Sequence, residues 1–359
     1  MSEYYLREDA PYARSGPVVK PGEFVFAAAA LEHPHIWGMC LGLIQAGATL
    51  KYVWDPDPKK VQEFLEKVKA GTPVDSIERI LEDPEIRLVA AAGIPNERAA
   101  LGIRVMEAGK DYYVDKAPMT TLAHVEAARE ACARTGHRYF VDYSERLRNK
   151  ASLVAGEIVR SGEIGEVVQL IGTGPHRHFS NPRPDWFYNH EQYGGILVDI
   201  GSHQTEQFLY FTGNTNATVL SSKVGNYANP QFPELEDFGD ATLLGDNGAT
   251  GYFRVDWLTG NGLRTWGDGR LIIMGTKGHI ELRKYIDITR EPARGNHVYL
   301  VNDREEKYID ANPIVKSYPI FAGIINDSLQ GTEDFMTQDY IFRAAELCIR
   351  AQMQAIRVR

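Results

Sequence analysis

The sequence lacks the features that mark secreted, disulfide-rich and membrane proteins. Its 359 residues include three cysteines, Cys40, Cys132 and Cys348, with neither metal-type spacing nor the even number of a disulfide set. No apolar run approaches the ~20 residues that span a bilayer, and residues 1–20 carry no apolar core of a signal peptide. We therefore expect a reduced, cytoplasmic setting and no membrane partner.

A basic character is also missing. Lysine and arginine total 39 against 48 aspartates and glutamates, which gives a net charge of −9, and no run of basic residues offsets it. This balance argues against nucleic acid as a partner. Apolar residues at 43% and charged residues at 24% are typical of a globular protein. The length suffices for two domains, because single cores usually stop growing near ~250–300 residues.

Short apolar runs alternate with segments of helical periodicity from residue 23 onward. The expected strands cover residues 24–30, 50–54, 87–92, 112–114 and 139–143. The expected helices between them cover residues 36–47, 58–68, 96–108 and 122–133. Strands that alternate with helices of this length predict right-handed crossovers and a parallel sheet.

The glycine-rich phosphate loop that usually follows the first strand of such a domain is absent. Where G-x-G-x-x-G is expected, the sequence reads AAAALEHPHIWG from Ala27 to Gly38. Small alanines still permit a close approach of backbone to phosphate, though less freely than glycine, and His33 and His35 could donate to phosphate oxygens. Either the loop binds a dinucleotide in this altered form, or the domain has lost the nucleotide and is only a scaffold.

An aspartate favours the first alternative. Asp55 ends the second expected strand, about twenty residues after the loop, where a carboxylate accepts hydrogen bonds from the adenosine ribose. The same charge repels a 2′-phosphate, so we expect NAD to be preferred to NADP.

A second stretch with catalytic potential begins at Gly194-Gly195 and ends at His203. If the segment after the glycines is helical, Asp199 and His203 stand one turn apart on the same face. A carboxylate beside an imidazole favours the protonated ring, as a general base near neutral pH requires. The alternative is an ordinary surface pair at the start of a helix.

The chain after residue 143 has a different pattern, which predicts a mostly antiparallel sheet. A helix at 150–160 is followed by expected strands at 167–171, 218–224, 241–244, 250–257, 271–274, 279–282 and 299–301, and by helices at 320–329 and 339–356. Residues 1–22, with Tyr4 and Tyr5, are polar and without period, so this arm is either disordered or laid against another surface. We expect three parts: the arm 1–22, a dinucleotide-binding domain 23–143 and a second domain 144–359, whose last helix could pack back on the first.

An ordered set of short motifs resembles the Gfo/Idh/MocA oxidoreductases over residues 23–355. The set comprises Ile94-Pro95-Asn96, Ala108-Gly109-Lys110, Asp115-Lys116-Ala117-Pro118 in place of Glu-Lys-Pro, Ser161 to Gly165, Gly194 to His203, and Gly275-Thr276-Lys277-Gly278. The resemblance implies an α/β fold with an N-terminal Rossmann domain and a C-terminal α/β domain. The large, mostly antiparallel open sheet of that second domain often joins subunits, so a homo-oligomer is expected.

The resemblance also assigns residues to roles. It implies the catalytic set Lys116, Asp199 and His203. The implied cofactor-binding residues are Leu31, His33, His35, Ile36, Asp55, Ile94, Asn96 and Lys116. No metal is implied. The glycine-poor first loop, the altered Glu-Lys-Pro motif and the N-terminal arm depart from the family pattern.

An aromatic and histidine-rich segment precedes the double glycine. His176, His178 and Trp186, together with Tyr143, Arg146 and His203, are the expected substrate contacts. Aromatic faces with nearby polar donors suit a sugar ring, although simple loop packing would give the same sequence. His176 and His178 with Asp199 or His203 could also form a zinc or manganese site.

These residues, together with the resemblance, predict hydride transfer between a secondary alcohol of a sugar, glycoside or polyol and NAD. The resemblance implies C3 of a glycoside as one reacting position, because members of that family oxidise it. His203 would take the hydroxyl proton, Asp199 would orient it, and Lys116, from the other domain, would bind the same oxygen. Two alternatives remain: a redox-neutral enzyme that recycles tightly held NAD, and a catalytically silent nucleotide or sugar sensor.

Overall fold

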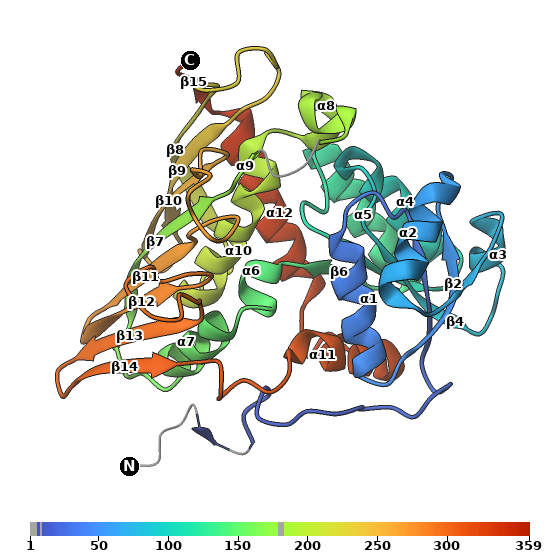
Figure 1. Ribbon diagram of the computed structural model, residues 1–359, viewed down its shortest axis with the longest axis horizontal. Helices are drawn as coiled ribbons and strands as arrows, with labels where there is room; N and C mark the ends of the chain where they lie inside the picture. Colours follow the sequence, from blue (N-terminus) through green and yellow to red (C-terminus); the bar gives the residue numbers. More distant parts are fainter. Residues whose placement is uncertain (1–5, 8, 179–182) are drawn as a thin grey trace. The chain divides into compact units, whose positions relative to one another are not determined.

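The computed structural model describes residues 6–7, 9–178 and 183–359 (Figure 1). Tyr4 and Tyr5 lie outside the described residues. The chain divides into two compact units. The parallel-sheet unit comprises residues 15–142 and 318–342, and the mixed-sheet unit comprises residues up to 14, 143–317 and 343–359.

The parallel-sheet unit contains the Rossmann arrangement that the alternating pattern predicts. Its strands, all paired in parallel, follow the order β3-β2-β1-β4-β5-β6. They are β1 (Val25–Ala29), β2 (Thr49–Trp54), β3 (Thr72–Pro73), β4 (Ile86–Ala91), β5 (Asp111–Asp115) and β6 (Tyr139–Asp142). The order reverses between β1 and β4, and the crevice at the carboxyl ends of these two strands is where such sheets bind ligands.

Helices connect these strands as expected, and local capping explains where two of them begin. The connections are α1 (His35–Gln45), α2 (Pro58–Val68), α3 (Glu78–Leu81), η2 (Pro95–Glu97), α4 (Arg98–Glu107) and α5 (Leu122–Thr135). The Asp57 carboxylate accepts a hydrogen bond from the backbone N–H of Lys59, and the Thr121 hydroxyl accepts one from that of His124. Side-chain oxygens of this kind satisfy N–H groups that have no partner in the first turn.

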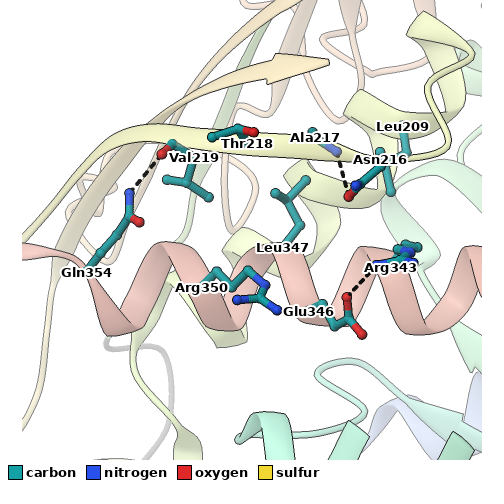
Figure 2. A pocket seen from close by; sticks show the side chains of 10 residues that line it. All are labelled: Leu209, Asn216, Ala217, Thr218, Val219, Arg343, Glu346, Leu347, Arg350 and Gln354. Carbon is teal, nitrogen blue, oxygen red and sulfur yellow. Dashed lines mark hydrogen bonds and ion pairs between the residues drawn. The ribbon is translucent and has the colours of Figure 1, made fainter. Parts of the chain in front are cut away.

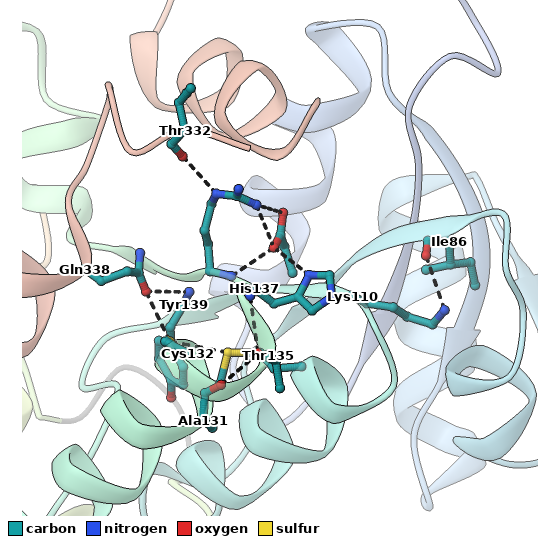
Figure 3. A network of polar contacts seen from close by, with 12 residues as sticks. Ile86, Lys110, Ala131, Cys132, Thr135, His137, Tyr139, Thr332 and Gln338 are labelled. Atoms are coloured by element: carbon teal, nitrogen blue, oxygen red, sulfur yellow. Dashed lines mark hydrogen bonds and ion pairs between the residues drawn. The ribbon is translucent and has the colours of Figure 1, made fainter. Parts of the chain in front are cut away.

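Residues 318–342 complete this unit. The ring of Phe321 in α11 (Pro319–Gln330) lies against Gly42 of α1, at a position that a Cβ would fill. The Arg138 guanidinium donates to the Thr332 carbonyl at 2.8 Å, and the Tyr139 N–H donates to Gln338 Oε1 at 2.8 Å (Figure 3). The division therefore differs from the predicted bounds 23–143 and 144–359, because buried contacts bring α11 and the start of α12 back to the first sheet.

The mixed-sheet unit is built on nine strands in the order β14-β13-β12-β11-β7-β10-β9-β8-β15. They are β7 (Val167–Pro175), β8 (Ala217–Gly225), β9 (Phe238–Gly245), β10 (Thr250–Asp256), β11 (Arg270–Gly275), β12 (Gly278–Arg283), β13 (His297–Asn302), β14 (Glu306–Asp310) and β15 (Ile356–Arg357). Only the β7–β10 and β8–β15 pairs are parallel. The prediction of an α/β fold with a large, mostly antiparallel second sheet is confirmed.

One face of this sheet is covered and the other is open. The unit's helices are α6 (Ser144–Leu147), α7 (Lys150–Arg160), η3 (Asp185–Tyr188), α8 (His190–Tyr193), α9 (Ile196–Asp199), α10 (Gly201–Thr212) and the part of α12 (Gln338–Met353) from residue 343 on. Helices α7 and α10 pack on one face (Figure 1). Side chains of the other face form a row across paired strands: Tyr252, Ile171, Ile272, Glu281, Tyr299 and Tyr308.

Contacts within the mixed-sheet unit hold both ends of the described chain. Tyr12 is buried against the mixed-sheet unit, and its carbonyl accepts from the N–H of Lys316 at 2.9 Å, so this part of the arm lies against its own chain. The helix predicted over 339–356 ends at Met353, because Ile356 leaves it to pair with β8. Across the described ranges, we find no helix that is both long enough and apolar enough to span a bilayer.

Candidate active site

The loop after β1 places two histidines at the crevice of the parallel-sheet unit. The His33 N–H donates to the Ala92 carbonyl at 2.9 Å, which fixes the loop beside the end of β4. The N–H groups of residues 35–37, at the start of α1, bond to loop acceptors at 3.2–3.3 Å. The backbone donors that a helix N-terminus usually offers to phosphate are therefore engaged, and the imidazole rings add side-chain donors beside them.

A buried carboxylate orients these histidines. Asp115, at the end of β5, is fully buried, with its Oδ1 2.9 Å from His35 Nδ1 and its Oδ2 3.5 Å from His33 Nδ1. Arg98 lies 3.5 Å from the second oxygen. Burial acts to raise the pKa of the Asp115 carboxyl, but the neighbouring His35, Arg98 and His33 hold it well below its usual range. Burial, then the charge of His35, lowers the pKa of His33 well below its usual value, so its ring is neutral.

Of the described residues, only His33, His35 and Asp115 bring three potential metal ligands together, with ligand atoms within 4.8 Å of one another. The positive charges of Arg98 and Lys116 act on the same cluster. One carboxylate facing two cations attracts an anion better than a divalent cation. The His176 and His178 arrangement raised as a metal site is not among the ligand groups of the described chain.

Asp55 connects the second strand to the same loop. Its Oδ2 accepts the Leu31 N–H at 2.6 Å and its Oδ1 accepts the Asp57 N–H at 2.8 Å. Burial raises the pKa of this carboxyl above its usual value. Each oxygen keeps a second lone pair, so the carboxylate can accept a ribose hydroxyl while it holds the loop.

The carboxyl ends of β4 and β5 provide an acceptor and an amine. The Asn96 side-chain oxygen is buried and has no hydrogen-bond partner in the described structure, as an acceptor reserved for a ligand would be. Asn96 lies in η2, directly after Ile94 and Pro95. Lys116 directly follows β5 and is 7% exposed; its peptide bond to Ala117 is cis. Arg98 donates to the carbonyls of residues 115 and 117 at 3.0 Å and to that of Lys116, which fixes this segment.

These groups fit a nicotinamide dinucleotide. Leu31, His33, His35 and Ile36 lie in the loop after β1 and at the start of α1, where this fold binds a pyrophosphate. Asp55 follows β2, where this fold binds a ribose, and Asn96 follows β4. All are in the parallel-sheet unit. When bound, NAD(P) supplies the acceptor or donor of a hydride.

The mixed-sheet unit keeps Asp199 and His203 in the predicted relation. Asp199 ends α9, and Ile200 has helical angles (φ −80°, ψ −37°), so the backbone continues into α10 and the two side chains share a face. Gly195 has a φ of +93°, and a Cβ there would overlap the Gln352 side chain, so glycine is required at this turn. His203 is 2% exposed and Asp199 is half-buried.

Sequence reasoning missed a polar cluster on the same helix. Glu145 of α6 accepts hydrogen bonds from Lys284 Nζ and from Gln204 Nε2, both at 3.2 Å. The Lys284 ammonium also donates to Gln207 Oε1. All four side chains are buried. No local motif identifies this cluster, because α6 and the end of β12 lie 139 residues apart in the sequence.

Aromatic rings lie close to the predicted substrate residues. The Trp257 ring lies 5.2 Å from that of His176, 6.3 Å from that of His178 and 5.0 Å from that of Phe187. The Arg183 guanidinium lies 4.9 Å from the Phe187 ring and 5.0 Å from the Trp257 ring. No local pattern in the sequence identifies Trp257 and Arg183. The predicted contact Trp186 lies with its ring 6.1 Å from that of Phe187.

The other two predicted substrate contacts, Arg146 and Tyr143, are buried, and the Tyr143 hydroxyl has no hydrogen-bond partner in the described structure. Arg146 forms a buried ion pair with Glu206 and lies 3.9 Å from the centre of the Tyr210 ring. Tyr143 is fully buried, and burial raises the pKa of its hydroxyl well above the usual value.

A separate cavity of about 300 Å³ lies between α12 and the start of β8. Figure 2 shows Arg343, Glu346 and Arg350 on the helix side and Thr218 and Val219 on the strand side. Arg343 and Glu346 form an ion pair at 3.0 Å. None of the predicted site residues lines this cavity.

Comparison with known proteins places the chain in a family. The model of the oxidoreductase family with an NAD-binding Rossmann fold matches residues 38–143, and that of the GFO/IDH/MocA C-terminal domain matches residues 153–281. The scyllo-inositol 2-dehydrogenase (NAD(+)) of Bacillus subtilis strain 168 is 25% identical over 272 residues, which make up 74% of this chain and 75% of that protein.

Solved structures of oxidoreductases share the fold of this chain. A protein from Erwinia carotovora atroseptica SCRI1043, named only as an oxidoreductase, is 48% identical with a TM-score of 0.90 over 94% of this chain and 100% of that one. Levoglucosan dehydrogenase, solved with NADH and levoglucosan, shares the fold with a TM-score of 0.78 at 16% identity, over 92% of this chain and 96% of that one. The chain belongs to the Gfo/Idh/MocA family of oxidoreductases, as an NAD(P)-dependent dehydrogenase that acts on CH–OH groups.

Proposed function

We propose that this enzyme uses NAD to oxidise a secondary alcohol of a sugar, glycoside or polyol, with Lys116, Asp199 and His203 as its catalytic residues. The observation that carries the proposal is the buried imidazole of His203 with the Asp199 carboxylate one helical turn before it. A buried imidazole–carboxylate couple suits proton transfer near neutral pH.

Each of the three residues has a separate role in the proton transfer. His203 accepts the proton of the reacting hydroxyl, and Asp199 stabilises the imidazolium that results. Lys116 donates a hydrogen bond to the same oxygen and stabilises its developing negative charge. NAD, when bound, would accept the hydride from the carbon. The alcohol would then become a ketone, and the hydroxyl proton would remain on His203.

The substrate class rests on the aromatic rings and on the relatives. The rings of Trp257 and Phe187, with His176 and His178 beside them, offer apolar faces and polar edges of the kind that bind pyranoses. Among the relatives, one is named for scyllo-inositol and one was solved with levoglucosan. Within this class we favour a ring hydroxyl, with C3 of a glycoside as one candidate.

The preference for NAD over NADP rests on Asp55. Its carboxylate is fixed by two backbone N–H groups at the end of β2, and a 2′-phosphate there would meet a negative charge.

The direct test incubates the purified protein with NAD and a panel of pyranosides and inositols. NADH absorbance and keto-product by mass spectrometry are both recorded. The proposal expects both signals with the same substrate. Keto-product without NADH would favour the redox-neutral alternative with recycled cofactor, and sugar binding without any product would favour a sensor.

We also propose a homo-oligomer formed through the open face of the nine-stranded sheet, in the cytoplasm. The exposed or half-buried row that includes Ile171, Tyr252, Ile272 and Tyr308 gives this face its apolar character. The three cysteines are buried and unbridged, as a reducing compartment favours. Sedimentation of the wild type and of Ile272→Lys tests the assembly: the variant should be smaller, and equal masses would argue against this face.

A further inference from the structure

The side of α10 that presents His203 also presents a buried ion pair. His203 and Gln207 are four residues apart, so their side chains project from the same side of the helix. Gln207 Nε2 donates to the His203 carbonyl at 2.8 Å, and its Oε1 accepts from Lys284. Lys284, which follows β12, is therefore on the His203 side of α10.

Lys284 holds the carboxylate of Glu145. Its Nζ lies 3.2 Å from Glu145 Oε2, and the same oxygen accepts from Gln204, the residue next to His203. Glu145 is 2% exposed, and its other oxygen, Oε1, is buried without a hydrogen-bond partner in the described structure. A buried acceptor without a partner is costly unless a charge or a donor faces it.

The charges of three nearby groups act on the Glu145 carboxylate. Burial acts to raise the pKa of Glu145, but the charges of Lys284, His203 and His176 lower it to about 2. The interaction between Glu145 and His203 is mutual, so the carboxylate must favour the protonated imidazole to the same extent.

Three other ionisable groups near this helix interact with partners of their own. Arg146 of α6 pairs with Glu206 of α10. Arg183, which precedes η3, interacts with Asp199 of α9. His176, after β7, directs Nδ1 to the Gly174 carbonyl at 3.1 Å. Apart from these pairs, the carboxylate of Glu145, whose Oε1 has no hydrogen-bond partner in the described structure, acts on His203.

We propose that Glu145 is a positioning residue for His203, a fixed carboxylate that stabilises the imidazolium formed when His203 accepts the substrate proton. This inference rests on the proposed role of His203 as the base. Because Lys284 and Gln204 hold the carboxylate in place before the proton arrives, no group has to reorient when the charge appears.

The test is a histidine titration by NMR in the wild type and in Glu145→Gln, with the His203 signal assigned from His203→Asn. The expected result is a fall in the His203 pKa of about one unit, a tenfold change in proton affinity. The acid limb of the kcat profile should move to lower pH by the same amount, while KM for the alcohol stays unchanged. A purely structural role would lower the amount of folded enzyme without moving this limb.

Two further variants make the outcome decisive. Glu157→Gln removes another buried carboxylate, which pairs with Arg160 in α7, and should leave the His203 titration unchanged. Glu145→Asp keeps the charge and the Lys284 partner, so it should fold and lower the His203 pKa by a smaller amount. If thermal melting shows that Glu145→Gln is unfolded, Glu145→Asp is titrated in its place.

The possible results separate the two proposals. An unchanged His203 titration in the folded Glu145 variant overturns the inference, whatever the activity. A shifted titration together with full turnover in His203→Ala overturns the role of His203 as base, and the electrostatic coupling of the two residues then stands without a catalytic purpose.

Discussion

The Nδ1 atom of His35 lies 2.9 Å from Asp115 Oδ1, which joins the first turn of α1 to the end of β5. Asp115 stands where the family motif has glutamate, directly before Lys116. The shorter aspartate thus serves two purposes: it orients the histidines of the altered phosphate loop, and it balances the buried Arg98 that fixes the carbonyls around Lys116.

Replacing this carboxylate should destabilise the protein strongly. Asp115→Asn leaves Arg98 as an uncompensated buried charge, and the expected loss is about 3–5 kcal/mol in the free energy of unfolding. Urea denaturation at pH 7 measures it. Glu85→Gln, which removes an exposed partner of Lys51, is the control and should cost about 0–1 kcal/mol.

The same variant gives a pH signature. The pKa of Asp115 is depressed in the folded protein, so its contribution is fully present above the unfolded value of about 4 and is lost as pH falls through the folded one. The stability difference between wild type and Asp115→Asn should therefore narrow only in strong acid. A difference that disappeared between pH 7 and 5 would contradict this account.

Cofactor affinity should depend on the histidines that replace the glycine-rich loop. Removing one hydrogen bond to a charged phosphate costs about 1.5–3 kcal/mol, so His35→Ala should weaken NAD binding by roughly tenfold or more. Titration of NADH fluorescence measures this. His124→Ala, near the start of α5 and outside the predicted cofactor-binding set, should leave the affinity unchanged. Equal affinities in the wild type and both variants would argue against His35 as a phosphate ligand.

Cofactor choice should depend on Asp55. Asp55→Ser removes the negative charge but keeps an acceptor, so the affinity for NADP should rise relative to that for NAD. Because Asp55 also holds Leu31, some loss of NAD affinity is expected as well. The ratio of the two dissociation constants, compared between wild type and variant, is the readout, and an unchanged ratio would argue against Asp55 as the discriminating group.

Both sheets could be predicted in outline, because the signals are local. Parallel strands buried on both sides, such as β1 and β4, appear as continuous apolar runs. The missed strands are β3 and β15, with two residues each, and the polar edge strand β14. Helix α12 was extended too far, because pairing of Ile356 with β8 is a tertiary effect.

Some residues of the candidate site could likewise be predicted from local sequence patterns, and others could not. Asp199 and His203 are four residues apart after a double glycine, so their relation could be read directly from the sequence. The contact between Glu145 and Lys284 spans 139 residues and has no sequence pattern. Trp257 likewise joins the aromatic rings only because β10 pairs with β7. The proposed base could therefore be predicted from local sequence spacing. The residues around it could be identified only from the folded structure.

The His33, His35 and Asp115 cluster should not make the enzyme dependent on a metal. Arg98 and Lys116 oppose a divalent cation there, so dialysis against a strong chelator should leave the activity and melting temperature unchanged. The opposite result would be a loss of activity after chelation that zinc or manganese restores in the wild type but not in His33→Ala. That result would assign the cluster to a metal.

Turnover should fall steeply without the His203 imidazole. A general base contributes roughly 10²–10⁴ in rate, so His203→Ala should lose about that much in kcat. NAD affinity should be unchanged, because the proposed cofactor-binding residues are in the parallel-sheet unit. Asp199→Asn keeps the imidazole and should lose less, and His124→Ala is the matched control. If His203→Ala instead kept wild-type kcat across the pH range, the proton acceptor would have to be another group, and the four-residue spacing of Asp199 and His203 on one helical face would have a structural role only.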